Sequence, residues 1–346
     1  MTLYRAFTVQ DQFGLNSLKA CSRPIPTPKA NQVLIQMSAI ALNYRDYLMV
    51  SGQYNPRQSL PFIPCSDGVG VIVETGPSCS LKVGMRVMPT FAQGWIADDP
   101  TKDVFKTTLG GPLDGTLAEY ICVDEKGVVE VPSYLTDLEA STLGCAGLTA
   151  WSALAELGQI KAGDQVVCIG TGGVSLFAAQ IANMLGADVW ITSRTQEKLN
   201  RLTPKILGFT LESDRKIVAS ESGWGRTIRQ ESWNKEGVDH IIEVGGAHTL
   251  SESLTAVRNG GTISLIGILS GHQTPLNLLP ILMRQIRIQG VFVGHKKGFE
   301  RFNKALSMHQ IHPIIDRVFD FSEAPQAFKA LAQGQHIGKL VIGIDH

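Results

Sequence analysis

The chain has 346 residues, of which 44% are hydrophobic and 18% are charged. Such a chain folds as an ordinary globular protein and is long enough for two domains with separate cores. Its 31 basic residues balance its 31 acidic residues, so no overall field favours a nucleic acid or an anionic membrane as a partner. A small molecule is therefore the expected partner.

The N-terminal residues Met1 to Val9 alternate polar and apolar side chains and lack the basic-then-apolar layout of a signal peptide. No apolar run approaches the roughly 18 residues that a membrane span needs. We therefore expect a cytoplasmic protein. The six cysteines are scattered without a C-x-x-C pair, and we interpret them as reduced thiols, most of them buried.

Short apolar runs divided by glycine and proline fill the first part of the chain, up to about residue 131. This spacing predicts a small, curved antiparallel sheet. The runs are Val33–Met37, Val69–Val73, Arg86–Met88, Leu117–Val123 and Val128–Val131.

From about Leu138, strand-length and helix-length segments alternate, which predicts a doubly wound parallel sheet covered on both faces. A helix is expected at Val174–Leu185. Four glycines and prolines interrupt residues 203–235, where only a weak strand is predicted near Lys216–Ala219. The other expected strands are Gln165–Ile169, Asp188–Thr192, His240–Val244, Thr262–Ile266 and Ile286–Val293.

The end of the chain is expected to return to the first domain. Helices are predicted at Phe299–Met308 and Ala324–Ala332, and a last strand at Lys339–Ile344. The sequence thus predicts an α/β protein with two domains. One comprises residues 1–131 with 299–346, and the other comprises residues 132–298.

A glycine turn between a buried strand and a helix is the clearest chemical signal. Gly170 permits a tight turn and Gly172 lets the backbone approach a pyrophosphate, while Gly173 and Val174 open a helix whose free N–H groups attract phosphate. Ser175 stands where the dinucleotide fingerprint has its third glycine. A plain structural turn is the alternative, but the strand before it and the helix after it favour a nucleotide site.

The end of the second strand bears on the choice of cofactor. A site for NAD needs an acidic side chain there for the ribose hydroxyls, and this chain has Ser193 and Arg194 instead. With Lys198 one helical turn further, these residues suit the 2′-phosphate of NADP. The alternative is a pair of solvated cations at a helix start, a place that helices disfavour for cations.

Six fragments occur in order along the chain, each common alone but specific as a set. They are Leu42 to Asp46 with Gly52 to Tyr54, Pro64 to Val71, Gly115 to Tyr120, Cys145 to Trp151, Gly170 to Ser175, and Gly338 to Ile342. Over its whole length the sequence resembles the medium-chain dehydrogenase/reductase superfamily. Within that superfamily it is most similar to the zinc-free, quinone-oxidoreductase-like branch. The resemblance implies a GroES-like, antiparallel β-rich catalytic domain and a Rossmann nucleotide-binding domain.

The resemblance also implies that no metal is bound. The positions that hold the catalytic zinc in alcohol dehydrogenases of this superfamily match Asn43, Ser66 and Cys145, so one thiolate of three ligands remains. Zinc needs nitrogen, sulfur or carboxylate ligands, and no histidine precedes His240. No cysteine lies between Cys79 and Cys122, whereas the structural zinc lobe of those relatives needs four close together.

Without a metal, charge that develops on the substrate oxygen must be stabilised by fixed hydrogen-bond donors. The resemblance places Asn43 and Tyr54, with Tyr47 as a further candidate, at the catalytic site. Packing within the first domain is the alternative for both tyrosines. Asp46 is better interpreted as a helix cap, and Cys145 as a buried thiol rather than a nucleophile.

Four further residues are expected to contact the cofactor. Thr149 matches a family position behind the nicotinamide, and Val244, Gly245 and Ile268 follow later strands at the carboxyl end of the sheet. The leading hypothesis is a zinc-independent oxidoreductase that passes hydride from NADPH to a quinone or a conjugated carbonyl compound. A zinc-type alcohol dehydrogenase with a degenerate metal site and a non-catalytic, crystallin-like cofactor-binding protein are the alternatives. By analogy with relatives, the strand Ile286–Val293 could pair across a homodimer.

Overall fold

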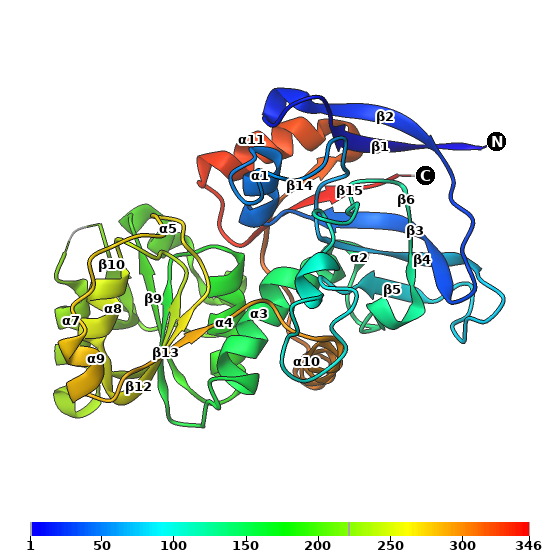
Figure 1. Cartoon of the computed structure of the whole chain (residues 1–346). Coiled ribbons are helices and arrows are strands. Elements are labelled where there is room, and N and C mark those ends of the chain that lie inside the picture. The colour runs from blue at the N-terminus through cyan, green and yellow to red at the C-terminus, as the bar shows by residue number, and fades with distance from the viewer. Residues whose placement is uncertain (1, 221, 346) are drawn as a thin grey trace. The chain divides into compact units, whose positions relative to one another are not determined.

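A computed structural model describes residues 2–220 and 222–345 and divides into two compact units (Figure 1). Unit 1 contains the residues up to Leu148 and those from Gly294 onward, and unit 2 is Thr149–Val293. Within the described residues, no helix is both long enough and apolar enough to cross a membrane.

The unit boundaries differ from those expected after residues 131 and 298. The segment after residue 131 stays with unit 1 because the Arg86 guanidinium holds the Asp137 carboxylate and the Leu135 carbonyl oxygen. Residues 294–298 also belong there, because the backbone N–H groups of Lys296 and Lys297 donate to carbonyls of the 89–116 segment. Both causes are contacts between segments far apart in the sequence.

Unit 2 is built on one six-stranded sheet in the order β10-β9-β8-β11-β12-β13, and every neighbouring pair is parallel. This is the strand order of the doubly wound Rossmann fold. The point at which the chain switches from one side of the sheet to the other lies between β8 and β11. All five residues of β8 are buried, as expected for a strand covered on both faces. The strands are β8 (Gln165–Ile169), β9 (Asp188–Ser193), β10 (Lys216–Val218), β11 (Val238–Glu243), β12 (Val257–Leu265) and β13 (Arg287–Gly290).

The helices of unit 2 follow its strands, as the sequence predicts. They are α4 (Gly173–Met184), α5 (Gln196–Arg201), α6 (Pro204–Leu207), α7 (Trp224–Glu231), α8 (Leu250–Ala256) and α9 (Leu279–Met283). The short helix α3 (Leu148–Trp151) begins at the unit boundary and continues into a π-helical turn, Ser152–Glu156.

Two strands of unit 2, β12 and β13, differ in length from the prediction by four residues each, and the others differ by one residue or none. β12 begins at Val257 rather than Thr262. The sequence Asn259-Gly260-Gly261 favours a turn, but here an irregularity in the pairing of β12 with β11 accommodates it within the strand. β13 ends at Gly290 rather than Val293, and Val293 has a φ of 47°, which no strand contains.

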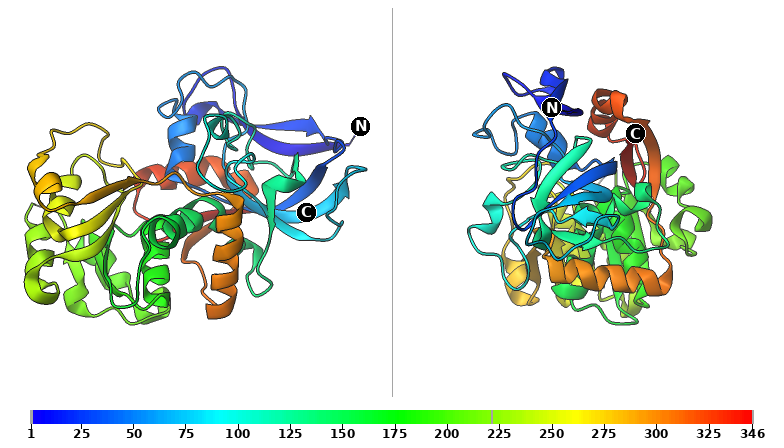
Figure 2. Two further views of the ribbon diagram at one scale, coloured as in Figure 1. Left: turned by 60° about the horizontal axis from the view of Figure 1, so that its bottom comes forward. Right: turned by 90° about the vertical axis from the view of Figure 1, so that its right-hand side faces the viewer.

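Unit 1 contains an antiparallel sheet with one parallel pair at its end, in the order β14-β15-β3-β4-β5-β7, and β6 also pairs with β3. Figure 2 shows the strands of this unit, coloured blue to cyan and red, from two further sides. A hairpin of β1 and β2 forms a separate sheet. The strands are β1 (Leu3–Val9), β2 (Leu18–Pro24), β3 (Gln32–Ala41), β4 (Asp67–Thr75), β5 (Arg86–Pro89), β6 (Tyr120–Asp124), β7 (Val128–Glu130), β14 (Ile315–Asp320) and β15 (Lys339–Gly343).

The last strand brings the end of the chain back into the core of unit 1, as expected. β15 pairs antiparallel with β3, so that Val341 lies opposite Ala41, and the N–H of Leu42 donates to Leu340 at 3.0 Å. This register sets Lys339 beside the start of α1 and so positions the site described below. The helices of unit 1 are α1 (Tyr44–Val50), α2 (Asp137–Ala140), α10 (Lys296–His309) and α11 (Ala324–Gln333).

Candidate active site

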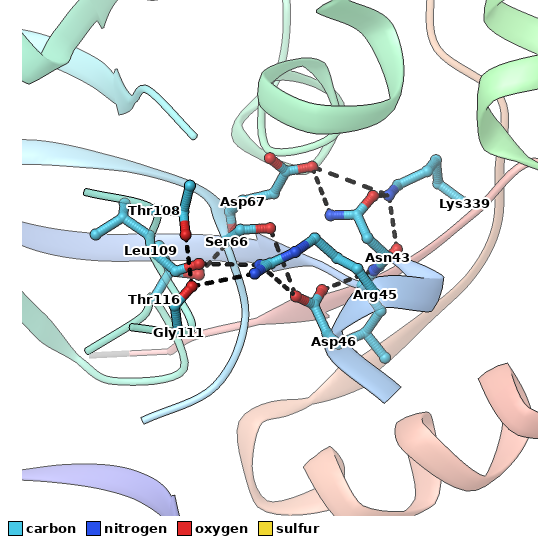
Figure 3. Close-up of polar contacts among 11 residues, drawn as sticks. Asn43, Arg45, Asp46, Ser66, Asp67, Thr108, Leu109, Gly111, Thr116 and Lys339 are labelled. Carbon is cyan, nitrogen blue, oxygen red and sulfur yellow. Dashed lines mark hydrogen bonds and ion pairs between the residues drawn. The ribbon is translucent and has the colours of Figure 1, made fainter. Parts of the chain in front are cut away.

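A buried polar cluster lies in unit 1 where α1, β4 and β15 meet (Figure 3). The ammonium of Lys339 donates to the carbonyl oxygen of Leu42 and to Oδ1 of Asn43, both at 2.6 Å. Nδ2 of Asn43 donates to Oδ2 of Asp67 at 2.9 Å. Lysine only donates and a carboxylate only accepts, so these two neighbours fix which way the Asn43 amide faces.

The Asp67 carboxyl group has no exposed surface. Burial raises its pKa to about 6, against the lowering effects of the Lys339 ammonium and the Asn43 amide. Asp67 also borders the π-helical turn Leu143–Gly147, since a Cβ on Gly144 would come within 2.8 Å of Oδ1. The cluster is therefore a buried site in which the amide of Asn43 joins the Lys339 ammonium to the Asp67 carboxyl group.

Asp46 is a helix-capping residue, as predicted. It is the third residue of α1, and its Oδ2 accepts the backbone N–H of Asn43 at 2.8 Å. Burial raises the pKa of Asp46, and the Arg45 guanidinium at 3.5 Å opposes that shift. The Ser66 hydroxyl donates to the same carboxylate at 3.5 Å.

The structure places the two predicted catalytic tyrosines in different surroundings. Tyr54 is 47% exposed, and its ring lies 5.3 Å from the Arg45 guanidinium. The same guanidinium lies 4.8 Å from the Phe91 ring. The Tyr54 hydroxyl has no hydrogen-bond partner among the residues that the structure describes. Tyr47, by contrast, packs against the core of unit 1. Tyr54 is thus the better placed of the two to donate to a ligand.

The three family ligand positions do gather around Asp67, but their chemistry does not fit a zinc ion. Oδ1 of Asn43 is bonded to an ammonium, and the Ser66 hydroxyl is directed to Asp46. Burial raises the pKa of the Cys145 thiol, which disfavours the thiolate that zinc needs. The residues at these three positions therefore do not supply the nitrogen, sulfur or carboxylate ligands that zinc prefers.

The 89–116 segment has a core of its own. Phe91 and Trp95 are buried, whereas Phe105 is 48% exposed. The Trp95 ring meets the His295 ring edge-on with centroids 5.8 Å apart, and the Arg45 guanidinium donates to the Leu109 carbonyl at 2.9 Å. Phe91 and Trp95 therefore belong to a local core of this segment.

In unit 2, the glycine turn has the geometry that a pyrophosphate needs. Gly170 has a φ of 81°, and Gly172 is the N-cap of α4. A Cβ on Gly172 would meet no atom within 4 Å, so the backbone there is open to a ligand. Ser175 in place of a third glycine closes the turn, because its hydroxyl donates to the Ile169 carbonyl at 2.6 Å. The residues present therefore fit a dinucleotide.

The predicted 2′-phosphate residues lie at the end of β9. The Ser193 side chain is buried and accepts the N–H of Thr195 at 3.3 Å, and Thr195 caps α5. Arg194 is exposed and has no ion-pair or hydrogen-bond partner within the described part of the chain. Lys198 is the third residue of α5 and is half-buried.

The remaining residues that the sequence predicts at the cofactor site differ in how much of their side chains is exposed. Thr149 is buried in α3, and Ile268 is 49% exposed. Val244 and Gly245 form a turn directly after β11. Sequence reasoning assigned no role to three buried charged residues beside these sites, Lys339, Asp67 and Glu243. Each stands at the end of an apolar strand, and a charged residue in such a place is a signal that could have identified them.

Two family models match the chain. The Alcohol dehydrogenase GroES-like domain matches residues 29–133, and the Zinc-binding dehydrogenase family matches residues 173–310. A zinc-type alcohol dehydrogenase-like protein of Schizosaccharomyces pombe is 34% identical over 98% of this chain and 99% of its own length. A similarly named protein of Leptosphaeria maculans is 30% identical over 94% of each chain.

Solved structures agree with these matches. A Sinorhizobium meliloti protein described as an alcohol dehydrogenase is 36% identical, with a TM-score of 0.88 over 99% of both chains. An NAD-dependent alcohol dehydrogenase is 25% identical, with a TM-score of 0.87 over 99% of this chain and 100% of the other. The chain belongs to the medium-chain dehydrogenase/reductase superfamily.

Proposed function

We propose that this member of an oxidoreductase family works without zinc and transfers hydride from NADPH to a quinone or a conjugated carbonyl compound. The observation that carries the proposal is the Lys339–Asn43–Asp67 cluster. It adjoins the positions that the resemblance gives to the zinc ligands, Asn43, Ser66 and Cys145. An amide bonded to an ammonium, a hydroxyl and a buried thiol are poor zinc ligands.

The substrate class follows from the absence of metal ligands. A zinc ion acts as a Lewis acid on a carbonyl oxygen, so a site without such an ion suits acceptors whose own conjugation spreads the incoming charge. A quinone or an enone has this property. The remaining charge on the acceptor oxygen is then stabilised by fixed donors.

Two groups of unit 1 could supply such donors. The Asn43 amide uses one N–H for Asp67 and has a second, and the ammonium on its oxygen polarises the amide and strengthens that N–H as a donor. The Tyr54 hydroxyl is the other. The bound cofactor would supply the hydride, and the chain's own part is to hold these donors in place and to exclude water.

NADPH rather than NADH is proposed on the charge at the end of β9. Ser193, Arg194 and Lys198 offer a hydroxyl and two cations, and no carboxylate follows β9 in the position that would repel a 2′-phosphate. The exposed Arg194 guanidinium is available to a phosphate.

The experiment is a screen of NADPH oxidation with quinones, enones, simple aldehydes and simple ketones. We expect turnover with the first two classes and little with the last two. In the same assay, Tyr54→Phe should lower kcat more than it changes cofactor affinity. Tyr44→Phe, which changes a partly exposed tyrosine at the start of α1, serves as the control. Turnover confined to simple aldehydes and ketones would contradict the proposal, and no turnover with any class would favour a non-catalytic protein.

A further inference from the structure

Glu243 is a buried carboxyl group that accepts four hydrogen bonds. It is the last residue of β11 and has no exposed surface. Its Oε1 accepts the backbone N–H groups of Gly245 and Gly246 at 2.8 and 3.0 Å and the Thr249 hydroxyl at 2.6 Å. Its Oε2 accepts the Ser253 hydroxyl of α8 at 2.5 Å.

The turn after β11 is wrapped around this carboxyl group. A Cβ on Gly245 would lie 2.3 Å from Oγ1 of Thr249, and Gly246 has a φ of 90°. Only glycine fits both positions. The turn leaves two N–H groups inside the protein, and the Glu243 carboxyl group satisfies both, since buried amides without a partner are costly.

The same turn is bonded to the turn after β12, residues 266–271. The backbone oxygen of Glu243 accepts the N–H of Ile266 at 2.9 Å, and the oxygen of Gly245 accepts the N–H and the hydroxyl of Ser270 at 2.7 and 2.8 Å. In return, the N–H of Ala247 donates to Gly271 at 3.0 Å. The two turns therefore form one hydrogen-bonded layer at the carboxyl ends of β11 and β12.

We propose that Glu243 is a positioning residue for the cofactor. Its carboxyl group fixes the turn that contains Val244 and Gly245, and through that turn it fixes the one that contains Ile268, so that both present a preformed surface. The proposal rests on the proposed function, in which these residues contact NADPH. A preformed turn lets the cofactor bind without first ordering that part of the chain.

The test compares graded variants of Glu243 with a matched control. Glu243→Gln keeps one oxygen for the turn and should weaken NADPH roughly threefold, whereas Glu243→Leu removes every acceptor and should weaken it at least about thirtyfold. Thr249→Val removes only the hydroxyl that donates to Oε1 of Glu243, and it is the third variant because it is expected to fold. The control is Asp239→Asn near the other end of β11, where that carboxylate accepts Gln165 N–H at 2.7 Å and the Arg258 guanidinium at 2.5 Å.

Amide hydrogen exchange supplies a readout that needs neither cofactor nor activity. In the Glu243 variants the amides of Gly245, Gly246 and Ser270 should exchange at least tenfold faster as a group, while the β8 amides stay protected. In Asp239→Asn these amides and the NADPH affinity should stay as in the wild type.

Unchanged exchange and unchanged NADPH affinity in Glu243→Gln and Thr249→Val would overturn the proposal. An equal loss of affinity in Asp239→Asn would also overturn it, because general destabilisation would then explain the effect. A wild-type protein that binds no nicotinamide cofactor would refute the proposed function. The hydrogen-exchange measurement would still apply to such a protein, because faster amide exchange in both turns of the Glu243 variants shows that Glu243 holds the two turns together.

Discussion

Lys339 and Asp67 are charged side chains with 3% or less of their surface exposed, and their shared partner Asn43 connects them. Their direct separation, 4.0 Å between Nζ and Oδ2, is long for an ion pair. Removing two charges from water is expensive unless further hydrogen bonds compensate, and here the Leu42 carbonyl and the Asn43 amide supply them. A cluster built this way is better explained by the orientation that it gives Asn43 than by any gain in stability.

Asp67 makes the stability of the protein depend on pH in a predictable direction. Its pKa in the folded protein is raised from 3.8 to about 6, so between these values the folded state binds the proton more tightly than the unfolded state does. The contribution of Asp67 to the free energy of unfolding therefore falls as pH rises from about 4 to about 6, by roughly 3 kcal/mol, and is level above about 7. Urea unfolding of wild type and Asp67→Asn at pH 4, 5, 6 and 7 measures it. A difference between the two that is constant with pH would show that Asp67 titrates normally.

The proposed preference for NADPH depends most on one residue, Arg194. Arg194→Ala should weaken NADPH about ten- to hundredfold and NADH little, because one charge-assisted contact is worth about 1.5 to 3 kcal/mol. Added salt should narrow the wild-type preference, since the side chain is exposed. Fluorescence titration of both cofactors checks this, with Lys205→Ala, a basic residue of α6, as the control. Equal losses for NADPH and NADH would mean that Arg194 does not recognise the 2′-phosphate.

The glycine turn shows what an element can reveal through local sequence alone. Strand β8, the turn and helix α4 are contiguous, and their boundaries match the prediction to within a residue. The role of Lys339 could not be predicted in this way, because its partner Asn43 lies 296 residues away. The unit boundaries and the links between the turns after β11 and β12 depend on contacts of the same long-range kind.

Gly172→Ala is a prediction at the scale of this element. A Cβ there meets no protein atom within 4 Å, and Gly172 has a φ of −81° that alanine adopts readily. We expect an unchanged thermal midpoint but at least about tenfold weaker binding of both NADPH and NADH, because the methyl group occupies the approach to the pyrophosphate. Calorimetry and cofactor titration together measure this. Normal binding in the variant would place the pyrophosphate elsewhere.

At the scale of the whole molecule, unit 2 has an apolar surface beside an open sheet edge. Leu278, Leu279, Leu282 and Met283 are each more than 60% exposed, and β13, which follows them, ends the sheet order. An open strand edge next to exposed leucines invites pairing with another strand. We propose that a second copy of this chain pairs there through β13.

Leu282→Asp should therefore convert a dimer to a monomer, because a charge would be buried in the interface. The control is Met308→Asp on α10, since Met308 is 82% exposed and lies in unit 1. Sedimentation at several concentrations distinguishes the species. A wild-type protein that is monomeric at every concentration would contradict the proposed pairing.

Metal content measured together with turnover tests the account most directly. Purified protein should contain far less than one zinc per chain and should oxidise NADPH with a quinone or an enone at a rate that chelators leave unchanged. The reason is that Asn43, which matches one of the family's zinc-ligand positions, is an amide whose oxygen already accepts from the Lys339 ammonium. Stoichiometric zinc, with activity lost on chelation and restored by added zinc, would contradict it.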